Sequence, residues 1–524
     1  MESMTASASA APPAGPHTGS TATIELHARV AVIQGVIGSV MMFLGSLGTG
    51  WIANGSPMVR HPLIIELRVN VWGVYACTAL LTLGAMLLIR SWLRLGQRLR
   101  GWPPGSQRTV TTAIVAWSLP LLFAVPIYSR DVYAYIGQGR LMLAGQDPYT
   151  EGISSLDNWF MLGADPEWAE ARTPYGPYFL WIAAAVVKIT GAQPDLSVML
   201  FRLVACVGVA LCVVYVPKLA RLHSVNGARA LWISVANPLF LISFVASAHN
   251  DALMVGLAVA GVYFAATKHP IIGILLVTGS IGIKPITILL LPFVGLLWAG
   301  KGASWPRRFL IWAATASLSF GVLAVSGLVD GLGLGWTWAL LDPIPGYTGY
   351  SPSGFLGQQV EQLGNALGLH GDQLAQQFRR LLQGSAIIIV LVLMFVGGDR
   401  KIVRRMGTSF AAVVLLSPII QPWYILWFLP FLAATGIKDN WQIRSIYIVI
   451  TFFVVFGAQD QLSVWPFIDL RVSVSQVAFV IAVAFTLYLA LLDRRTRTLL
   501  THGGWQGWFG PGAAQPSTEL RWPS

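Results

Sequence analysis

Apolar runs of about 20 residues recur along almost the whole chain, and they limit the fold more than any other feature of the sequence. A run of that length with few charges can cross the hydrocarbon core of a bilayer as a helix. A backbone in lipid must satisfy its own hydrogen bonds, so only helices or closed barrels can cross. Charged residues make up 11% of the chain, against about 25% in soluble domains. The sequence therefore predicts an all-α polytopic membrane protein.

The apolar runs predict about 14 spanning helices within one transmembrane domain, residues 23–492. Several runs are short for a span, which favours broken or tilted helices around a cavity. The approximate segments are 29–51, 69–90, 109–127, 198–217, 228–247, 251–267, 270–283, 285–300, 309–327, 383–397, 407–420, 423–436, 444–458 and 473–492. Residues 1–22 are rich in Ala, Pro, Ser, Thr and Gly, and we expect a disordered tail there.

The distribution of Lys and Arg predicts which loops face the cytoplasm, because cytoplasmic loops carry an excess of both. Alternating the predicted spans places 23 of the 34 Lys and Arg residues inside, ten outside, and Arg202 within a span. Both termini, including the tail 493–524, are then cytoplasmic. The net charge of +12 reflects this bias and does not indicate nucleic-acid binding.

Two large loops are expected on the outer face of a plasma membrane, at residues 128–197 and 328–382. The first contains an apolar segment, 176–190, that is too short for a simple span. If it crossed, the later charge pattern would invert. We therefore interpret it as a helix that lies along the outer membrane face or re-enters it.

The stretch Ser129–Tyr149 directly follows an apolar run, Thr111–Ile127, and places an Arg–Asp pair where the chain should leave the bilayer. If residues 131–143 are helical, Asp131, Tyr135 and Gln138 share one face. The residues Val132, Ile136 and Leu143 lie on a neighbouring apolar face, which suits a helix resting on the membrane. A carboxylate at this position could act as a general base toward a lipid-linked substrate. The alternative is that Ser129 or Asp131 only caps the helix.

Two proline-containing turns follow in the same loop. Asp147 and Tyr149 flank Pro148, and Tyr175 lies in the sequence Thr-Pro-Tyr-Gly-Pro. Proline fixes φ and aspartate bonds the following backbone, so each stretch is typical of a turn. Asp147, Tyr149 and Tyr175 could also contact a sugar.

Polar residues interrupt the later apolar runs at outer junctions. His249, Asn250 and Asp251 separate two runs, and they are either helix caps or the wall of an active cavity. Lys284 lies at membrane depth, where a cation is costly and suggests function. Phosphate is its natural partner, although the side chain could instead reach to the interface.

Gln421, Trp423 and Tyr424 form a third such junction. Its aromatic residues could belong to the interfacial belt or form a stacking platform for a sugar. The sequence contains no GxxxxGK[ST] loop, no HExxH motif, and no DxD pair in the first outer loop. A chelated divalent metal is therefore not indicated, and we expect no cofactor.

Three blocks together resemble a known family: SRDVYAYIGQGRLMLAGQDPY, TPYGPYFLWIAAAVV and HNDALMVGLAVAG. They are similar to the actinobacterial polyprenol-phosphomannose-dependent α-1,6-mannosyltransferases of lipomannan synthesis, the MptA/MptB type, and closer to MptB. The resemblance covers roughly residues 30 to 490. It implies a GT-C glycosyltransferase fold with juxtamembrane helices in the first large outer loop. Typical GT-C enzymes place this loop after the first span, whereas here it follows the third.

The resemblance also implies roles for the candidate residues. Asp131 would be the general base of an inverting transfer from polyprenyl phosphomannose to a lipid-anchored mannan, extending the lipomannan and lipoarabinomannan backbone. Lys284, Arg130 and His249 would bind the donor phosphate, and no metal would be needed. The residues expected to contact the sugars are Tyr135, Gln138, Asp147, Tyr149, Tyr175, Asn250, Asp251, Gln421, Trp423 and Tyr424.

Two other functions compete with this interpretation. A transporter or flippase of a lipid-linked sugar would place ionisable groups near the midplane, whereas the polar groups here gather at the ends of the spans. A related transferase, such as an arabinosyltransferase, could use the same polar side chains on another polyprenyl-phosphate sugar.

Overall fold

The described part of the chain consists of helices joined by loops and contains no strand. A computed structural model describes residues 19–337, 346–460, 471–511 and 519–521. The first ten helices are α1 (Gly19–Thr49), α2 (Pro62–Val69), α3 (Val71–Arg98), α4 (Ser106–Leu122), α5 (Asp131–Leu143), α6 (Pro177–Thr190), α7 (Pro194–Leu222), α8 (Gly227–Ser234), α9 (Pro238–Leu241) and α10 (Asp251–Ala266). The later helices are α11 (Pro270–Ile283), α12 (Leu291–Ala299), α13 (Trp305–Asp330), α15 (Pro352–Ala366), α16 (Gly371–Phe395), α17 (Ile402–Leu416), α18 (Ile425–Ala434), α19 (Trp441–Asp460), α20 (Arg471–Leu487), α21 (Arg494–Thr501) and α22 (Gly504–Phe509). The all-α prediction is confirmed.

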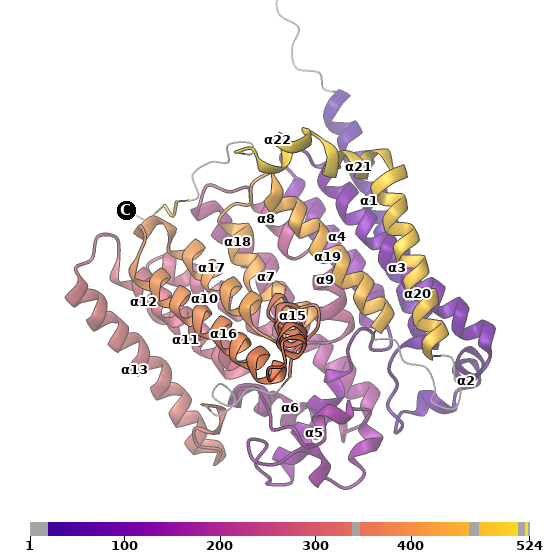
Figure 1. Ribbon diagram of the computed structural model, residues 1–524, viewed down its shortest axis with the longest axis horizontal. Helices are drawn as coiled ribbons and strands as arrows, with labels where there is room; N and C mark the ends of the chain where they lie inside the picture. The colour runs from indigo at the N-terminus through magenta and orange to yellow at the C-terminus, as the bar shows by residue number, and fades with distance from the viewer. Residues whose placement is uncertain (1–18, 338–345, 461–470, 512–518, 522–524) are drawn as a thin grey trace, which may run out of the picture.

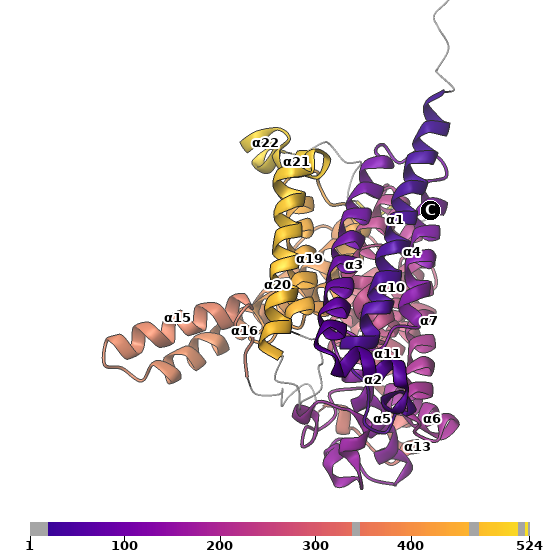
Figure 2. The ribbon, with the colours of Figure 1, turned by 90° about the vertical axis from the view of Figure 1, so that its right-hand side faces the viewer.

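The long helices run side by side in one bundle whose two ends differ (Figures 1 and 2). One end, at the top of both views, carries α21, α22 and the start of α1. The opposite end carries α2, α5 and α6. The hairpin of α15 and the first part of α16 projects sideways from the bundle (Figure 2).

Seven described helices are long and apolar enough to cross a membrane: α1, α3, α7, α13, α16, α19, and α20 with the turn that follows it. A bent pair of segments, 227–234 and 238–246, raises the number to eight if it is one span. The other predicted spans fall on shorter helices, so length and composition do not establish the predicted number of about 14.

The bent pair illustrates why some predicted spans are broken. The two segments meet at 60° around Asn237 and Pro238. Proline has no N–H to donate to the preceding turn, so the helix cannot continue through it. The Asn237 amide group replaces the lost bonds by donating to the carbonyls of Ile233 and Ser234, and its oxygen accepts from the Phe240 N–H. Asn237 therefore ends one helix and begins the next.

A second break separates α11 from the 3-10 turn η6 (Pro285–Leu290). A residue before proline is driven out of the helical region, and Lys284 has extended backbone, with φ −144° and ψ 115°. The Gly176 N–H donates to the freed Ile283 carbonyl over 3.0 Å. A Cβ on Gly176 would lie 2.5 Å from the Ile281 and Gly282 carbonyl oxygens, so only glycine fits. This break fixes the position of the Lys284 side chain.

The two helices predicted in the first outer loop are present as α5 and α6. They pack against each other at one end of the bundle (Figure 1). The interpretation of α5 as a helix resting on the membrane is wrong, however, because nine of its thirteen residues are buried. Val132 and Ile136, assigned to its membrane face, are fully buried in protein, and Leu143 is exposed.

Close contact between α7 and α10 sets the depth of the next polar turn. Gly208 and Gly256 lie at the crossing, where a Cβ on Gly208 would overlap the Ala252 carbonyl oxygen. The buried Arg202 of α7 also donates to the carbonyls of Ala246 and Leu122, each the last residue of a helical segment. These contacts hold the chain before residue 251 against α7.

The predicted tails are described only in part. Residues 1–18 of the expected disordered tail lie outside the described residues, and α1 begins at Gly19. The tail 493–524 includes two helices, and its Leu520 and Arg521 N–H groups donate to the Arg400 and Leu222 carbonyls. Within the second predicted outer loop, α13 ends at Asp330 and residues 338–345 lie outside the described residues.

Candidate active site

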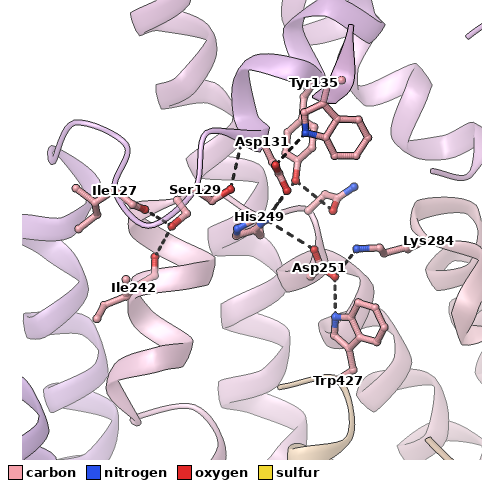
Figure 3. Close-up of polar contacts among 12 residues, drawn as sticks. Ile127, Ser129, Asp131, Tyr135, Ile242, His249, Asp251, Lys284 and Trp427 are labelled. Atoms are coloured by element: carbon pink, nitrogen blue, oxygen red, sulfur yellow. Dashed lines mark hydrogen bonds and ion pairs between the residues drawn. The ribbon is translucent and has the colours of Figure 1, made fainter. Parts of the chain in front are cut away.

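Two polar turns from distant parts of the chain are tied together at the end of the bundle that carries α5. The Ser247 hydroxyl donates to the Ile127 carbonyl over 2.6 Å. Tyr128 and Ala248, the residues that follow these two, both have positive φ, 66° and 58°. Such values are uncommon for residues other than glycine and concentrate at functional sites. The paired turns bring Asp131 and His249 face to face (Figure 3).

Asp131 begins α5 with a partly buried carboxylate whose side chain is 18% exposed. The Trp168 indole Nε1–H donates to its Oδ1 over 3.1 Å, and the Asp131 N–H donates to the Ser129 hydroxyl. Loss of solvent raises the pKa of Asp131 to about 6, although the Trp168 hydrogen bond and the Lys284 charge act in the opposite direction. An aspartate with this pKa is ionised at neutral pH and is still basic enough to take a proton.

His249 lies between Asp131 and Asp251 and is 1% exposed. Its Nδ1 is 3.7 Å from Asp131 Oδ2, and its ring stacks on Trp423 with centroids 3.8 Å apart. Burial lowers the pKa of His249 to about 3, which outweighs the attraction of Asp251. The ring is therefore neutral at pH 7 and adds no positive charge, and the binding of the donor phosphate by His249 stays a prediction.

Asp251 is buried, and two groups hold its carboxylate (Figure 3). The Lys284 ammonium lies 2.9 Å from Asp251 Oδ1, and the Trp427 indole N–H donates to the same oxygen over 2.6 Å. The Lys284 Nζ also lies 4.8 to 5.7 Å from the centroids of the Trp427, Tyr424 and Tyr175 rings, within the range of cation–π attraction. Asp251 therefore holds the Lys284 ammonium in place, and the Lys284 side chain remains 12% exposed.

Aromatic rings pack the space between these charged groups. Tyr135 is fully buried, and its hydroxyl lies 3.5 Å from His249 Nδ1 and from the Asn250 side-chain oxygen. Its ring meets Tyr175 edge to face. The Tyr149 hydroxyl donates to the Tyr175 carbonyl over 3.0 Å, which supports the second proline turn. Burial raises the pKa of Tyr135 and Tyr175 well above the ordinary range, so both hydroxyls stay protonated.

The Arg130 guanidinium is bound to residues of the first outer loop and of the segment after α1. Its NH2 lies 2.7 Å from the Asp165 carboxylate, and its guanidinium stacks 4.3 Å above the Trp51 ring. These contacts order the loop that carries Trp168, because Asp165 also accepts a hydrogen bond from the Glu167 N–H. The structure therefore gives Arg130 partners that stabilise the loop.

Three other predicted site residues have local contacts. The Asp147 carboxylate accepts from the Tyr149 N–H over 2.8 Å, as expected of a turn. Gln138 is buried, and its side-chain oxygen has no hydrogen-bond partner among the described residues. Gln421 precedes the 3-10 turn η9 (Pro422–Tyr424) and accepts from the Tyr424 N–H through its backbone carbonyl. None of the three has a hydrogen bond to Asp131 or Lys284 in the described part of the chain.

The sequence missed Trp168 and Trp427, the two indole donors to the carboxylates. Trp168 lies in a loop with several other aromatic residues, and Trp427 lies within an apolar run. Neither position has a local pattern that separates a hydrogen-bond donor from a packing residue, so only the fold could reveal them.

Across the described residues, no group of three or more His, Cys, Asp or Glu side chains is placed to hold a metal ion.

Sequence comparison identifies two matching family models. One is described as the N-terminal domain of alpha-(1->6)-mannopyranosyltransferase and matches residues 32–300, over half of the chain. The other, described as the MptB C-terminal domain, matches residues 354–490. No solved structure matches the chain, so the GT-C fold implied by the resemblance stays a prediction.

Several curated proteins are similar over most of their length. A probable alpha-(1->6)-mannopyranosyltransferase of Mycolicibacterium smegmatis is 32% identical, over 82% of this chain and 83% of the relative. An alpha-(1->6)-mannopyranosyltransferase of Mycobacterium tuberculosis is 30% identical over 86% of both chains. Alpha-(1->6)-mannopyranosyltransferase A of the same organism is 33% identical, over 75% of this chain and 78% of the relative.

Proposed function

The chain belongs to the alpha-(1->6)-mannopyranosyltransferase family, and from this premise we propose how it transfers mannose and which residues take part. It is a membrane-embedded mannosyltransferase that forms α-1,6 links. The donor we propose is polyprenyl phosphomannose, and the acceptor is a lipid-anchored mannan of the lipomannan and lipoarabinomannan backbone. The reaction inverts the anomeric centre of the donor.

Asp131 is the general base of this reaction. Its carboxylate takes the proton from the 6-hydroxyl of the acceptor mannose as that oxygen forms a bond to C1 of the donor mannose. The bond between C1 and the phosphate oxygen breaks, and polyprenyl phosphate leaves with the electron pair. The observation that carries the proposal is the pKa of about 6 at Asp131, together with its position 3.7 Å from His249 at the accessible edge of a buried cluster.

Lys284 binds the donor phosphate. Negative charge grows on the leaving phosphate, and a fixed cation nearby lowers the barrier. Asp251 and Trp427 hold the Lys284 ammonium in place through a shared oxygen. An ammonium has three donors, and Asp251 takes one, which leaves two for phosphate oxygens. We expect no metal ion to be required, because this charge comes from a side chain.

The neutral groups around the two charges would orient the sugars. Tyr424 is partly exposed and stacks on Trp427 with centroids 3.9 Å apart, so it offers a platform beside Lys284. Asn250 has a buried side-chain nitrogen without a hydrogen-bond partner among the described residues, and so does His249 at Nε2. Both can bind a sugar hydroxyl after a small movement. The competing transporter and arabinosyltransferase functions gain no support from the relatives named above.

The orientation we propose places this cluster on the outer face of a bacterial plasma membrane. The start of α1 and the helices α21 and α22 lie at the opposite end of the bundle from α5 (Figure 2). The excess of Lys and Arg on the loops of that opposite end supports a cytoplasmic location for it.

The test is transfer by Asp131→Asn, which removes the base and keeps the shape of the side chain. Purified protein is supplied with radiolabelled polyprenyl phosphomannose and an α-1,6-mannoside acceptor, and the linkage of the product is determined. We expect the rate to fall at least ~10²-fold, the lower range for general-base catalysis. Asp157→Asn, which changes an exposed carboxylate in the same loop, is the control and should stay within a few-fold of wild type. Near-normal transfer by Asp131→Asn would refute the assignment.

A further inference from the structure

A cavity of about 210 Å³ opens at the end of the bundle opposite to Asp131. It lies between α1, α3 and α21, which meet at the top of Figure 2. The residues that line it are His27, Val30, Ala31, Gln34, Arg90, Arg94, Arg98 and Arg495. The cavity therefore combines four guanidinium groups with a small apolar floor from α1.

The positive charge in this cavity is only partly neutralised. No carboxylate lines it among the described residues. Asp493, immediately before α21, forms an ion pair with Arg94, and its Oδ2 lies 3.6 Å from Arg90 Nε. The same Oδ2 accepts a hydrogen bond from the Thr496 hydroxyl. This one carboxylate thus pairs with two of the four arginines, and its hydrogen-bonding capacity is largely used.

Two of the arginines retain their full donor capacity. The side chains of Arg98 and Arg495 make no ion pair or hydrogen bond with any residue that the structure describes. The Arg90 NH1 group donates a hydrogen bond to the Gln34 side-chain oxygen, whereas the buried Arg90 Nε has no hydrogen-bond partner in the described part of the chain. Guanidinium groups repel one another when they share a cavity, so a bound anion would relieve that repulsion.

We propose that this cavity is a binding site for a phosphate group, separate from the transferase site. Guanidinium forks match phosphate oxygens and make charge-assisted hydrogen bonds with them. A basic pocket between helices at a membrane–water boundary is suited to an anionic phospholipid, and Val30 and Ala31 would contact its glycerol and upper acyl carbons. Free phosphate shares the same chemistry, and the experiment separates these two sources.

The experiment measures lipid-dependent thermal stability of the full chain, purified in a neutral detergent. Dioleoylphosphatidylglycerol should raise the melting temperature, and dioleoylphosphatidylcholine should not, because its choline cation opposes the arginines. In the double variant Arg98→Gln with Arg495→Gln, half-maximal stabilisation should require roughly tenfold more phosphatidylglycerol, the change expected for loss of charge-assisted hydrogen bonds. Inorganic phosphate forms a third arm, and a larger shift with phosphate than with phosphatidylglycerol assigns the site to a soluble phosphate.

The matched control removes the same charge at the same end of the bundle. Arg100 and Arg494 are exposed and do not line the cavity, so Arg100→Gln with Arg494→Gln should respond to phosphatidylglycerol as wild type does. Equal weakening in both double variants would overturn the proposal, because it would show general attraction to charge. If the first variant is unstable without lipid, Arg98→Lys with Arg495→Lys replaces it and should also bind more weakly. Asp131→Asn should respond as wild type, so this test does not depend on the proposed mechanism.

Discussion

The indole of Trp168 should tune the basicity of Asp131, and Trp168→Phe tests this directly. The Nε1–H donates to Asp131 Oδ1 over 3.1 Å, and a hydrogen bond to the charged form of a carboxylate lowers its pKa. Phenylalanine keeps most of the packing against Tyr175, whose ring stacks on Trp168, but it cannot donate. The variant should therefore raise the pKa of Asp131 above its value of about 6.

The size of the change follows from the geometry. Hydrogen bonds to charged groups contribute about 1.5–3 kcal/mol, and the 3.1 Å length and 18% exposure of Asp131 favour the lower limit. One pKa unit corresponds to about 1.4 kcal/mol, so the pKa should rise by about one unit, to about 7. At pH 7 the ionised fraction of Asp131 would fall from about nine-tenths to about half.

The assay is the pH dependence of kcat/KM for mannosyl transfer, which reports the pKa of the base in the free enzyme. The acid limb should lie near pH 6 in wild type and about one unit higher in Trp168→Phe. Trp159→Phe changes another partly buried tryptophan of the same loop and should leave the limb in place. If Trp168→Phe loses activity without moving the acid limb, Trp168 acts through another contact and the reasoning fails. A wild-type limb near pH 4 would refute the desolvation of Asp131.

Three further outcomes follow from the same contacts. Lys284→Gln leaves the buried Asp251 carboxylate unpaired, so the free energy of unfolding should fall by about 3–5 kcal/mol, seen as a lower melting temperature. Adding Asp251→Asn to this variant should restore the stability but not the mannosyl transfer, and restored transfer would contradict the role of Lys284. Gly208→Val should destabilise the detergent-solubilised protein by about 1–3 kcal/mol or more, because its side chain would overlap α10; Gly321→Ala, with open space around it, should not. Because the folded-state pKa of Asp131 is raised, its carboxyl contributes stability below pH 3.8 that is lost as the pH rises through about 6. Asp131→Asn should therefore melt at or above the wild-type temperature at pH 7, with the difference shrinking toward pH 5; a lower melting temperature at pH 7 would argue against the raised pKa.

The sequence by itself determined the class of the protein and the outline of its site. Long apolar runs with few charges leave the backbone no alternative to helices in lipid. The helix Asp131–Leu143 could also be predicted with its boundaries, because local periodicity and a polar start define it. The three polar junctions containing His249, Lys284 and Trp423 could also be recognised from local sequence, because each interrupts an apolar run. Polar groups at such positions are costly in a membrane and therefore suggest a function.

What surrounds each polar group depends on contacts between residues far apart in the chain. Asp131 meets Trp168 and His249, and Asp251 meets Lys284 and Trp427, across separations from 33 to 176 residues. No local pattern encodes such partners, so the indole donors were missed and the neutral state of His249 was not foreseen.

Tertiary structure also decided the location of α5, which the sequence placed on the membrane surface. Its apolar face is the same whether lipid or protein covers it, because both are equally apolar to a Val or Ile side chain. Only the packing of α6 and the following loop shows that protein covers this face. The sequence thus specified which groups are polar and where the chain turns. The fold decided which of those groups meet, and through desolvation and hydrogen bonding it set the charge that each one carries.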